Sequence, residues 1–237
     1  MLDGLSIGVV IPARDEAAAI GKVIAEVPAW ADAIVVADNG SRDETAKIAS
    51  EAGATVVHEP RPGYGGACLA ALDALPPCDV VVFLDGDYSD YPDDMRDLVR
   101  PITQGRADFV IGSRMLRGDA EAALTPQQRY GNRLAVTLIR LIWGVHYTDL
   151  GPFRAIRRTA LDRLEMADRD FGWTVEMQIK AAEKGLTVAE VPIRYRQRIG
   201  VSKISGTVSG TLRAGTKILW VIGRHGLRRL CHLASPN

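Results

Sequence analysis

The chain has 237 residues, of which 47% are hydrophobic and 24% are charged, so it is long and apolar enough to bury a substantial core as a globular protein. Its net charge is zero, but residues 1–112 hold 8 basic and 19 acidic residues (net −11), whereas residues 113–237 hold 21 basic and 10 acidic residues (net +11). The sequence has no uninterrupted apolar run of the about 20 residues that crosses a bilayer, no signal-peptide pattern, and no CxxC pair or histidine cluster of a zinc site.

The first half alternates two patterns. Short β-branched segments that are apolar on both faces predict buried parallel strands at residues 6–11, 33–37, 55–57, 80–84 and 109–111. Amphipathic segments between them predict helices at residues 16–26, 43–52, 66–74 and 93–100. Strand and helix in alternation predict right-handed βαβ units, and hence an α/β fold with a mainly parallel, doubly wound central sheet.

The second half is less regular and is basic. We expect a helix over residues 173–184, a strand over 187–193 at or near a sheet edge because it contains Pro192, and a mobile loop over 200–210. Two longer segments, 126–143 and 211–229, predict amphipathic helices with cations repeated at helical spacing. These cations are Arg129, Arg133, Arg140, Arg213, Lys217, Arg224 and Arg228.

Polar residues follow four of the predicted strands, where a parallel sheet places its ligand-binding loops. These loops are residues 12–16, 38–43, 58–63 and 85–87. Mg²⁺ and Mn²⁺ prefer carboxylate, water and phosphate oxygens, so Asp85 and Asp87 predict a metal site, with Gly86 leaving room for a diphosphate. An ordinary surface loop would also explain two aspartates around a glycine, but four polar loops at one rim favour a functional cleft.

Five short motifs occur in a fixed order: PARDE at 12–16, DNGSRD at 38–43, DGD at 85–87, GSR at 112–114 and DLGPFR at 149–154. In order and spacing they resemble the motifs of family 2 glycosyltransferases, and in particular the dolichyl-phosphate mannose synthase-like subgroup of polyprenyl-phosphate glycosyltransferases. The resemblance covers roughly residues 5–205 and implies the GT-A fold, a Rossmann-like three-layer fold of nucleotide-diphospho-sugar transferases. It also implies inverting transfer of a hexose from a UDP-glucose or GDP-mannose type of donor to a polyprenyl phosphate, with Mg²⁺ or Mn²⁺ as cofactor.

The resemblance implies a role for each matching residue on the donor side. Asp85 and Asp87 would hold the metal on the donor diphosphate, and Asp87 also belongs to the catalytic set. The residues that would bind the donor are Pro12, Ala13, Arg14, Glu16, Asp38, Asn39, Arg61, Gly65, Gly86, Arg198, Ser202 and Lys203. Arg198, Ser202 and Lys203 belong to a segment that resembles an R-x-G-x-S-K loop of the subgroup, and we expect this loop to fold over the donor diphosphate. The resembling enzymes continue their metal motif with Leu-Gln where this chain has Tyr88 and Ser89, so Ser89 replaces a side-chain metal ligand.

The acceptor side is expected to be cationic. A phosphate acceptor is already anionic at neutral pH and needs positive charge, whereas a sugar hydroxyl needs a carboxylate base. Arg114 and Arg129 match arginines of the resembling subgroup, and Arg117 and Arg133 are their neighbours, so we expect them at the acceptor phosphate. A solvated basic face is the alternative explanation for these arginines.

Three alternatives for the function stay open. The same fold could transfer sugar to a soluble hydroxyl acceptor, with Asp149, Asp170 or Glu176 as the base. A nucleotidyltransferase would share the nucleotide and the metal but release pyrophosphate. A non-catalytic nucleotide-sugar sensor would bind the donor and show no turnover.

These patterns divide the chain into a catalytic domain over residues 1–205 and a basic amphipathic helix over residues 206–237. Within the domain, residues 1–112 form the nucleotide-sugar and metal half, and residues 113–205 form the acceptor half. We expect a cytoplasmic protein whose basic helices either meet the inner face of a membrane or pack against the domain or a partner. No nucleic-acid partner is expected.

Overall fold

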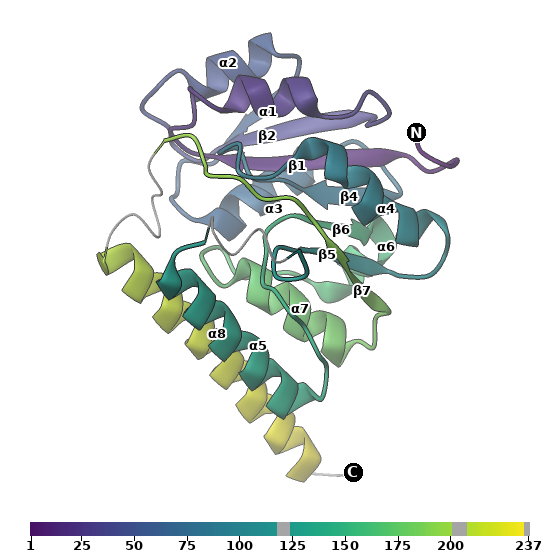
Figure 1. The fold of residues 1–237 in the computed structure, drawn as a ribbon, viewed down its shortest axis with the longest axis vertical. Coiled ribbons are helices and arrows are strands. Elements are labelled where there is room, and N and C mark those ends of the chain that lie inside the picture. Colours follow the sequence, from purple (N-terminus) through teal and green to yellow (C-terminus); the bar gives the residue numbers. More distant parts are fainter. Residues whose placement is uncertain (118–123, 201–207, 235–237) are drawn as a thin grey trace.

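The computed structural model describes residues 1–117, 124–200 and 208–234. Its strands are β1 (Ile7–Ala13), β2 (Ala33–Asp38), β3 (Thr55–His58), β4 (Val80–Phe83), β5 (Phe109–Ser113), β6 (Arg154–Arg157) and β7 (Val188–Pro192). Its helices are α1 (Ile20–Glu26), α2 (Thr45–Glu51), α3 (Tyr64–Ala74), the short 3₁₀ helix η1 (Pro92–Asp94), α4 (Met95–Thr103), α5 (Pro126–Trp143), α6 (Arg158–Leu164), α7 (Trp173–Glu183) and α8 (Val208–Ala234). Helices cover both faces of the sheet, which gives three layers (Figure 1).

The strands lie in the order β3-β2-β1-β4-β6-β5-β7, and every neighbouring pair is parallel except the two pairs made by β6. The predicted α/β fold is confirmed, as are the five strands of the first half and the edge position of the strand that contains Pro192. Strand β6 was not predicted, because Arg154 and Arg157 interrupt its apolar pattern. Arg154 is nevertheless fully buried, and its guanidinium donates to the carbonyl oxygens of Gly151 and Thr174.

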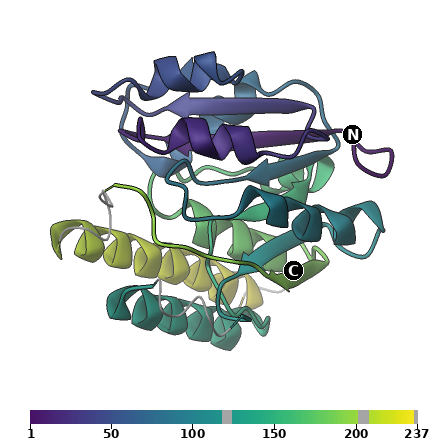
Figure 2. The ribbon, with the colours of Figure 1, turned by 45° about the horizontal axis from the view of Figure 1, so that its top comes forward.

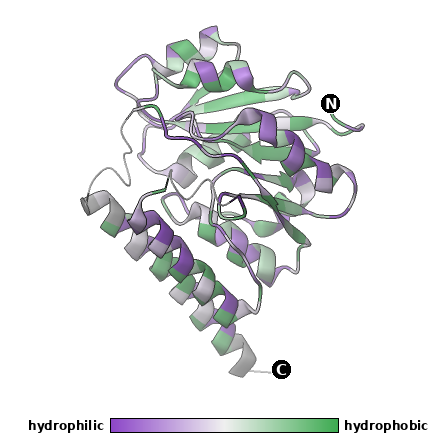
Figure 3. Cartoon of the chain, in the orientation of Figure 1, coloured by the Kyte–Doolittle hydropathy of each residue, from purple (hydrophilic) through white to green (hydrophobic). Residues whose placement is uncertain are grey.

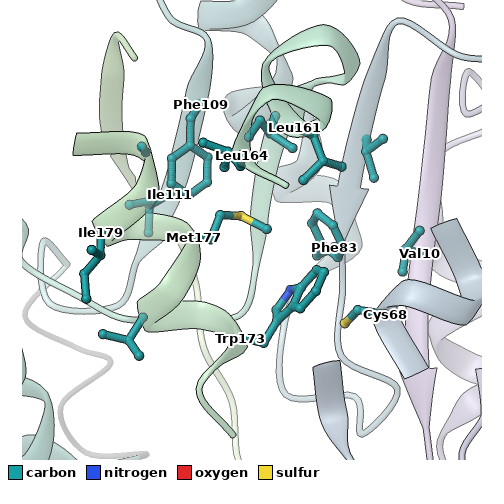
Figure 4. Close-up of a cluster of buried hydrophobic side chains, with 14 of the residues drawn as sticks. Val10, Cys68, Phe83, Phe109, Ile111, Leu161, Leu164, Trp173, Met177 and Ile179 are labelled. Atoms are coloured by element: carbon teal, nitrogen blue, oxygen red, sulfur yellow. The ribbon is translucent and has the colours of Figure 1, made fainter. Parts of the chain in front are cut away.

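Apolar side chains hold helices on both faces of the sheet. On one face α1, α2 and α4 cover residues such as Ile11 and Val82, and on the other α3, α6 and α7 cover Val10 and Phe83. Successive strand residues point to opposite faces, which is why these strands are apolar at every position. In the second cluster, shown in Figure 4, the rings of Phe83 and Trp173 meet edge to face with centroids 5.9 Å apart. This packing fixes the end of β4.

Helices α5 and α8 lie side by side, and both also pack against α7 (Figures 1 and 2). Helix α8 buries Val221 and Ile222, and it approaches α5 so closely that a Cβ on Gly226 would lie 3.3 Å from the Cδ1 of Ile142. Both predicted basic helices are thus confirmed as helices. In the described part of the chain, no helix combines the length and the apolar character that a membrane span requires.

Candidate active site

A cleft of about 950 Å³ opens at the carboxyl ends of β1, β2 and β4, the edge where parallel α/β sheets place their ligands. The strand-end loops, the start of α3, the loop before α7 and the first half of α8 line it. Ten residues predicted from the sequence are among its lining: Pro12, Ala13, Arg14, Glu16, Asn39, Asp85, Gly86, Asp87, Asp170 and Arg198. The strand-end loops therefore converge on one rim, as the strand pattern predicts.

Three carboxylates, Glu16, Asp85 and Asp87, form what we call the acidic floor of this cleft. The hydroxyl of Tyr64 donates a hydrogen bond to Oδ1 of Asp85 at 3.0 Å. Burial, and then the neighbouring charge of Asp87, raise the pKa of Asp85 from 3.8 to about 7. A divalent cation bound by both aspartates would offset their repulsion, so this pair fits Mg²⁺ or Mn²⁺.

The floor leaves most of a metal's coordination to other groups. Among the described residues, no group of three or more histidine, cysteine or acidic side chains is arranged to hold a metal ion. Mg²⁺ is commonly held by one or two carboxylates together with water and substrate phosphates. The two aspartates therefore suit a metal that arrives with a diphosphate.

The residues after Asp87 add further buried negative charge. The N–H of Ser89 donates to Oδ1 of Asp87 at 2.9 Å, so Ser89 supports a floor carboxylate through its backbone. Asp90 is 2% exposed, and neither of its carboxylate oxygens has a partner of normal hydrogen-bond geometry among the described residues. Burial, and then the charges of Asp85 and Asp87, raise the pKa of Asp90. A bound cation would offset this excess of charge.

The segment that follows β7 crosses in front of the sheet and reaches the floor (Figure 1). Arg198 donates from Nη2 to Oε1 of Glu16 at 2.8 Å, and its Nη1 lies 3.1 Å from Oδ2 of Asp87. The N–H of Ile199 donates to the carbonyl oxygen of Asp87 at 3.0 Å. Two further residues predicted for this segment lie outside the described residues, namely Ser202 and Lys203. The predicted boundary at residues 205 and 206 lies there too, so the division of the chain at that point stays a prediction.

Asn39 joins two of the strand-end loops. Its Nδ2 donates to the carbonyl oxygens of Glu59 and Arg61 at 3.0 and 2.8 Å, and its Oδ1 accepts from the N–H of Gly63 at 2.8 Å. The side-chain amide thus fixes the rim of the cleft. The side chain of Arg61 is 76% exposed and pairs with Glu59.

The other predicted residues in the described part of the chain do not line the cleft: Asp38, Arg61, Gly65, Arg114, Arg117, Arg129, Arg133, Asp149 and Glu176. Asp38 is buried beside it and accepts from the N–H of Ser41, and its Oδ2 lies 3.0 Å from Nδ1 of His58. Arg117 and Arg129 are exposed. The structure thus separates the predicted donor residues, most of which meet in the cleft, from the predicted acceptor residues.

Arg114 and Asp149 form a buried ion pair. Nε and Nη2 of Arg114 donate to the two carboxylate oxygens of Asp149 at 2.8 and 2.7 Å, and Asp149 is fully buried. Burial lowers the pKa of Arg114, but the charge of Asp149 more than offsets it and the pKa lies above its usual value. Glu176 is also buried; it accepts from the N–H of Asp168 and pairs with Lys180. Two of the candidate bases are thus held in contacts away from the cleft.

Two predicted glycines have packing reasons of their own. A Cβ on Gly65 would lie 1.9 Å from the carbonyl oxygen of Asp168, so only glycine allows the start of α3 to approach the loop before α7. A Cβ on Gly86 would meet Ala13 and Ile20 at 3.3 and 3.4 Å. The missing side chain of Gly86 therefore faces the core, and the residue lines the cleft with its backbone.

Comparison with known proteins accounts for this arrangement. A family model described as Glycosyl transferase family 2 matches residues 8–165, which is more than half of the chain. The chain belongs to glycosyltransferase family 2.

Its relatives in this family are similar along most of their length. An uncharacterised glycosyltransferase of Mycobacterium tuberculosis is 37% identical over 213 residues, covering 89% of this chain and 95% of the relative. A dolichyl-phosphate hexose transferase of Haloferax volcanii is 35% identical over 209 residues, covering 86% of this chain and 89% of the relative. The crystal structure of glucosyl-3-phosphoglycerate synthase from M. tuberculosis with Mn²⁺, UDP-glucose and phosphoglyceric acid superimposes with a TM-score of 0.74 at 26% identity, over 93% of this chain and 80% of that one. The GT-A fold is thereby confirmed.

The family's motifs account for the acidic floor but not for a second side of the cleft. There α8 contributes five residues that we call the α8 wall: Leu212, Arg213, Thr216, Lys217 and Trp220. From its sequence this helix is expected outside the catalytic domain, and its signals are an amphipathic pattern and cations at helical spacing. Asp170, one of the candidate bases predicted from the sequence, also lines the cleft, whereas Tyr64 and Phe171 line it without any signal in the sequence.

Proposed function

We propose that this family 2 glycosyltransferase moves a hexose from a UDP-glucose or GDP-mannose type of donor to a polyprenyl phosphate, with inversion at the anomeric carbon. The observation that supports this best is that one cleft combines the acidic floor with the cationic and apolar α8 wall. A metal-bound diphosphate needs carboxylates, and a lipid phosphate needs cations beside apolar surface. The relative from H. volcanii is named for hexose transfer involving dolichyl phosphate, which supports the same acceptor class.

In this proposal Asp85 and Asp87 hold Mg²⁺ or Mn²⁺, which when bound would neutralise charge on the departing nucleoside diphosphate. Structures of glucosyl-3-phosphoglycerate synthase hold Mn²⁺ or Mg²⁺ with UDP, which supports this cofactor. The rim around Pro12 and Asn39 binds the nucleoside. An acceptor phosphate oxygen attacks C1 from the face opposite the diphosphate, and the C1–oxygen bond to the diphosphate breaks as the new bond forms. Lys203, which lies outside the described residues, would stabilise charge on the donor diphosphate. Arg114 and Arg129, predicted for the acceptor phosphate, do not line the cleft, and Arg114 is paired with Asp149.

We also propose that α5 and α8 contact the inner face of an anionic membrane. Neither helix contains an acidic residue, and Tyr130, Leu141 and Leu227 are 76%, 75% and 65% exposed. Arg133 and Arg140 are exposed next to these apolar residues, so polar and apolar positions alternate along α5 (Figure 3). Exposed apolar side chains interspersed with cations are typical of helices that lie in a membrane interface.

A soluble acceptor is the second candidate. Asp170 lines the cleft, so a carboxylate that could accept a proton from a hydroxyl is present there. The structural relative with 26% identity binds phosphoglyceric acid, a small soluble compound.

An acceptor assay tests the proposal. Purified enzyme with Mn²⁺ and radiolabelled UDP-glucose or GDP-mannose is given either undecaprenyl phosphate or 3-phosphoglycerate, and the products are separated into lipid and water phases. We expect label in the lipid phase and release of a nucleoside diphosphate. Label only in the water phase would favour the second candidate, release of pyrophosphate would indicate a nucleotidyltransferase, and donor binding without any turnover would indicate a sensor.

A further inference from the structure

The α8 wall places two cations in the cleft from one face of one helix. Arg213 and Lys217 are four residues apart, which puts them one turn apart on the same face, and both line the cleft. Leu212 and Trp220 flank them and are 65% and 52% exposed. The wall therefore offers positive charge between two apolar side chains.

Lys217 and Arg213 differ in the contacts that they already make within the protein. Nζ of Lys217 lies 2.8 Å from Oδ2 of Asp168, and an ammonium group has three donors, so two remain for a ligand. The guanidinium of Arg213 is exposed and forms no ion pair or hydrogen bond with a described residue. By contrast, Arg198, which also lines the cleft, is already bound to Glu16 and Asp87. The charge of Arg213 is thus available to an anion that enters the cleft.

Asp168 fixes the position of this wall. Its Oδ1 accepts from the N–H groups of Asp170 and Gly172 at 2.8 and 3.1 Å, while its Oδ2 pairs with Lys217. The loop before α7 and the first half of α8 are therefore joined at one carboxylate. Phe171, which belongs to this loop, lines the cleft as well and adds to its apolar surface.

We propose that Arg213 and Lys217 bind the phosphate monoester of the acceptor, and that Leu212, Trp220 and Phe171 contact the organic chain attached to it. This rests on the proposed function and gives it an acceptor site on α8, a helix beyond the residues matched by the family model. The acidic floor repels an anion that carries no metal, whereas the α8 wall attracts one. The metal-bound donor diphosphate and the acceptor phosphate would therefore bind at different sides of the cleft. The apolar flanks favour a prenyl phosphate over a small polar one.

Calorimetric titration tests this site without requiring turnover. The full chain is saturated with UDP and Mn²⁺ and titrated with farnesyl phosphate, and in a second series with 3-phosphoglycerate. We expect Arg213→Gln to weaken farnesyl phosphate binding about tenfold or more, because a charge-assisted hydrogen bond contributes on that order. Arg213→Lys should retain part of the affinity, and binding of UDP should stay unchanged. The matched control is Arg96→Gln, which removes an exposed arginine of α4 outside the cleft and should leave both ligands unaffected.

The outcomes separate this site from the proposed function. Equal losses for Arg213→Gln and Arg96→Gln, an equal loss of UDP affinity, or wild-type protein that binds neither phosphate compound would each overturn the proposal. If 3-phosphoglycerate binds through Arg213 and farnesyl phosphate does not, the phosphate site stands and the prenyl chain is excluded. A wild-type enzyme that binds farnesyl phosphate through Arg213 but transfers no sugar to undecaprenyl phosphate would refute the proposed function alone.

Discussion

The acidic floor and the α8 wall line the same cleft but are held in place differently. Asp85 and Asp87 directly follow a strand that is buried on both faces, and each accepts a hydrogen bond from a neighbouring group. The wall lies on a helix supported by α5 and α7, with Lys217 paired to Asp168. The position of the acidic floor therefore depends mainly on the strand that precedes it, whereas the position of the α8 wall depends on packing between segments that are distant in the sequence. We expect changes in the floor to affect every turnover, and changes in the wall to affect the acceptor.

The largest effect should come from the floor itself. Asp85→Asn removes one of the two proposed metal ligands, and metal stabilisation of a leaving diphosphate amounts to several kcal/mol, so sugar transfer should fall about 1000-fold or more. The measurement is the initial rate of sugar transfer as Mn²⁺ is increased. Without metal, the variant should have a melting temperature no lower than that of the metal-free wild type, and this control would show that the variant is folded. A loss of less than about tenfold would remove Asp85 from the metal site.

The buried ion pair of Arg114 and Asp149 should contribute to the stability of the fold. Asp149→Asn leaves the buried guanidinium of Arg114 without its counter-ion, so the free energy of unfolding should fall by about 3–5 kcal/mol. Urea titration of the metal-free protein measures this. If stability is unchanged while transfer to a soluble hydroxyl acceptor is lost, Asp149 acts as a base rather than as a structural partner.

A third change tests the close approach between the start of α3 and the loop before α7, which is paired with α8. Gly65→Ala places a Cβ 1.9 Å from the carbonyl oxygen of Asp168, at the loop that is paired with Lys217. We expect a loss of about 1–3 kcal/mol in the free energy of unfolding, as for other overpacked sites. The matched control is Gly131→Ala in α5, where an added Cβ has no neighbour within 4 Å and stability should not fall. Equal stability of both variants would show that this close approach is dispensable.

The acidic floor should also make the free energy of unfolding depend on pH, and for each pH unit this change is small. In the folded, metal-free protein the pKa of Asp85 is raised from 3.8 to about 7, so between these values the folded state keeps a proton that the unfolded state has lost. The free energy of unfolding should therefore decrease as pH rises from about 4 to 7, by at most about 1.4 kcal/mol per pH unit. Asp85→Asn should remove this component, and Mn²⁺ should reverse it in the wild type. Denaturant titrations in EDTA at several pH values measure it, and identical slopes for both proteins would contradict it.

The sequence predicted well which polar loops meet at the cleft, because the signals of these loops are local. Each of its polar loops directly follows a strand whose apolar, β-branched pattern is unmistakable, and parallel strands bring their carboxyl ends to one edge. Asp85, Asp87 and Arg14 could therefore be placed at one rim from chain order alone. Chain order does not reveal that Asp38 accepts a hydrogen bond within its own loop, or that the missing side chain of Gly86 faces the core.

The positions of the residues predicted for the acceptor depend on contacts between distant segments. Strand β6 inserts antiparallel between β4 and β5, although Arg154 and Arg157 hide its pattern. Arg114 finds Asp149 only because these segments meet in space, and that pairing takes both residues away from the cleft surface. A bidentate pair between residues 35 positions apart has no local signature.

The sequence by itself determined the α/β alternation, the strand-end carboxylates and the family, because each is written in consecutive residues. The tertiary structure decided where α8 lies. This helix has one side buried on α5 and α7, one side in the cleft, and one side exposed, and its periodicity does not say which partner each side meets. The choice is made by packing of residues such as Val221 and Ile222 and by the pairing of Lys217 with Asp168. A basic amphipathic helix thereby becomes a wall of the cleft.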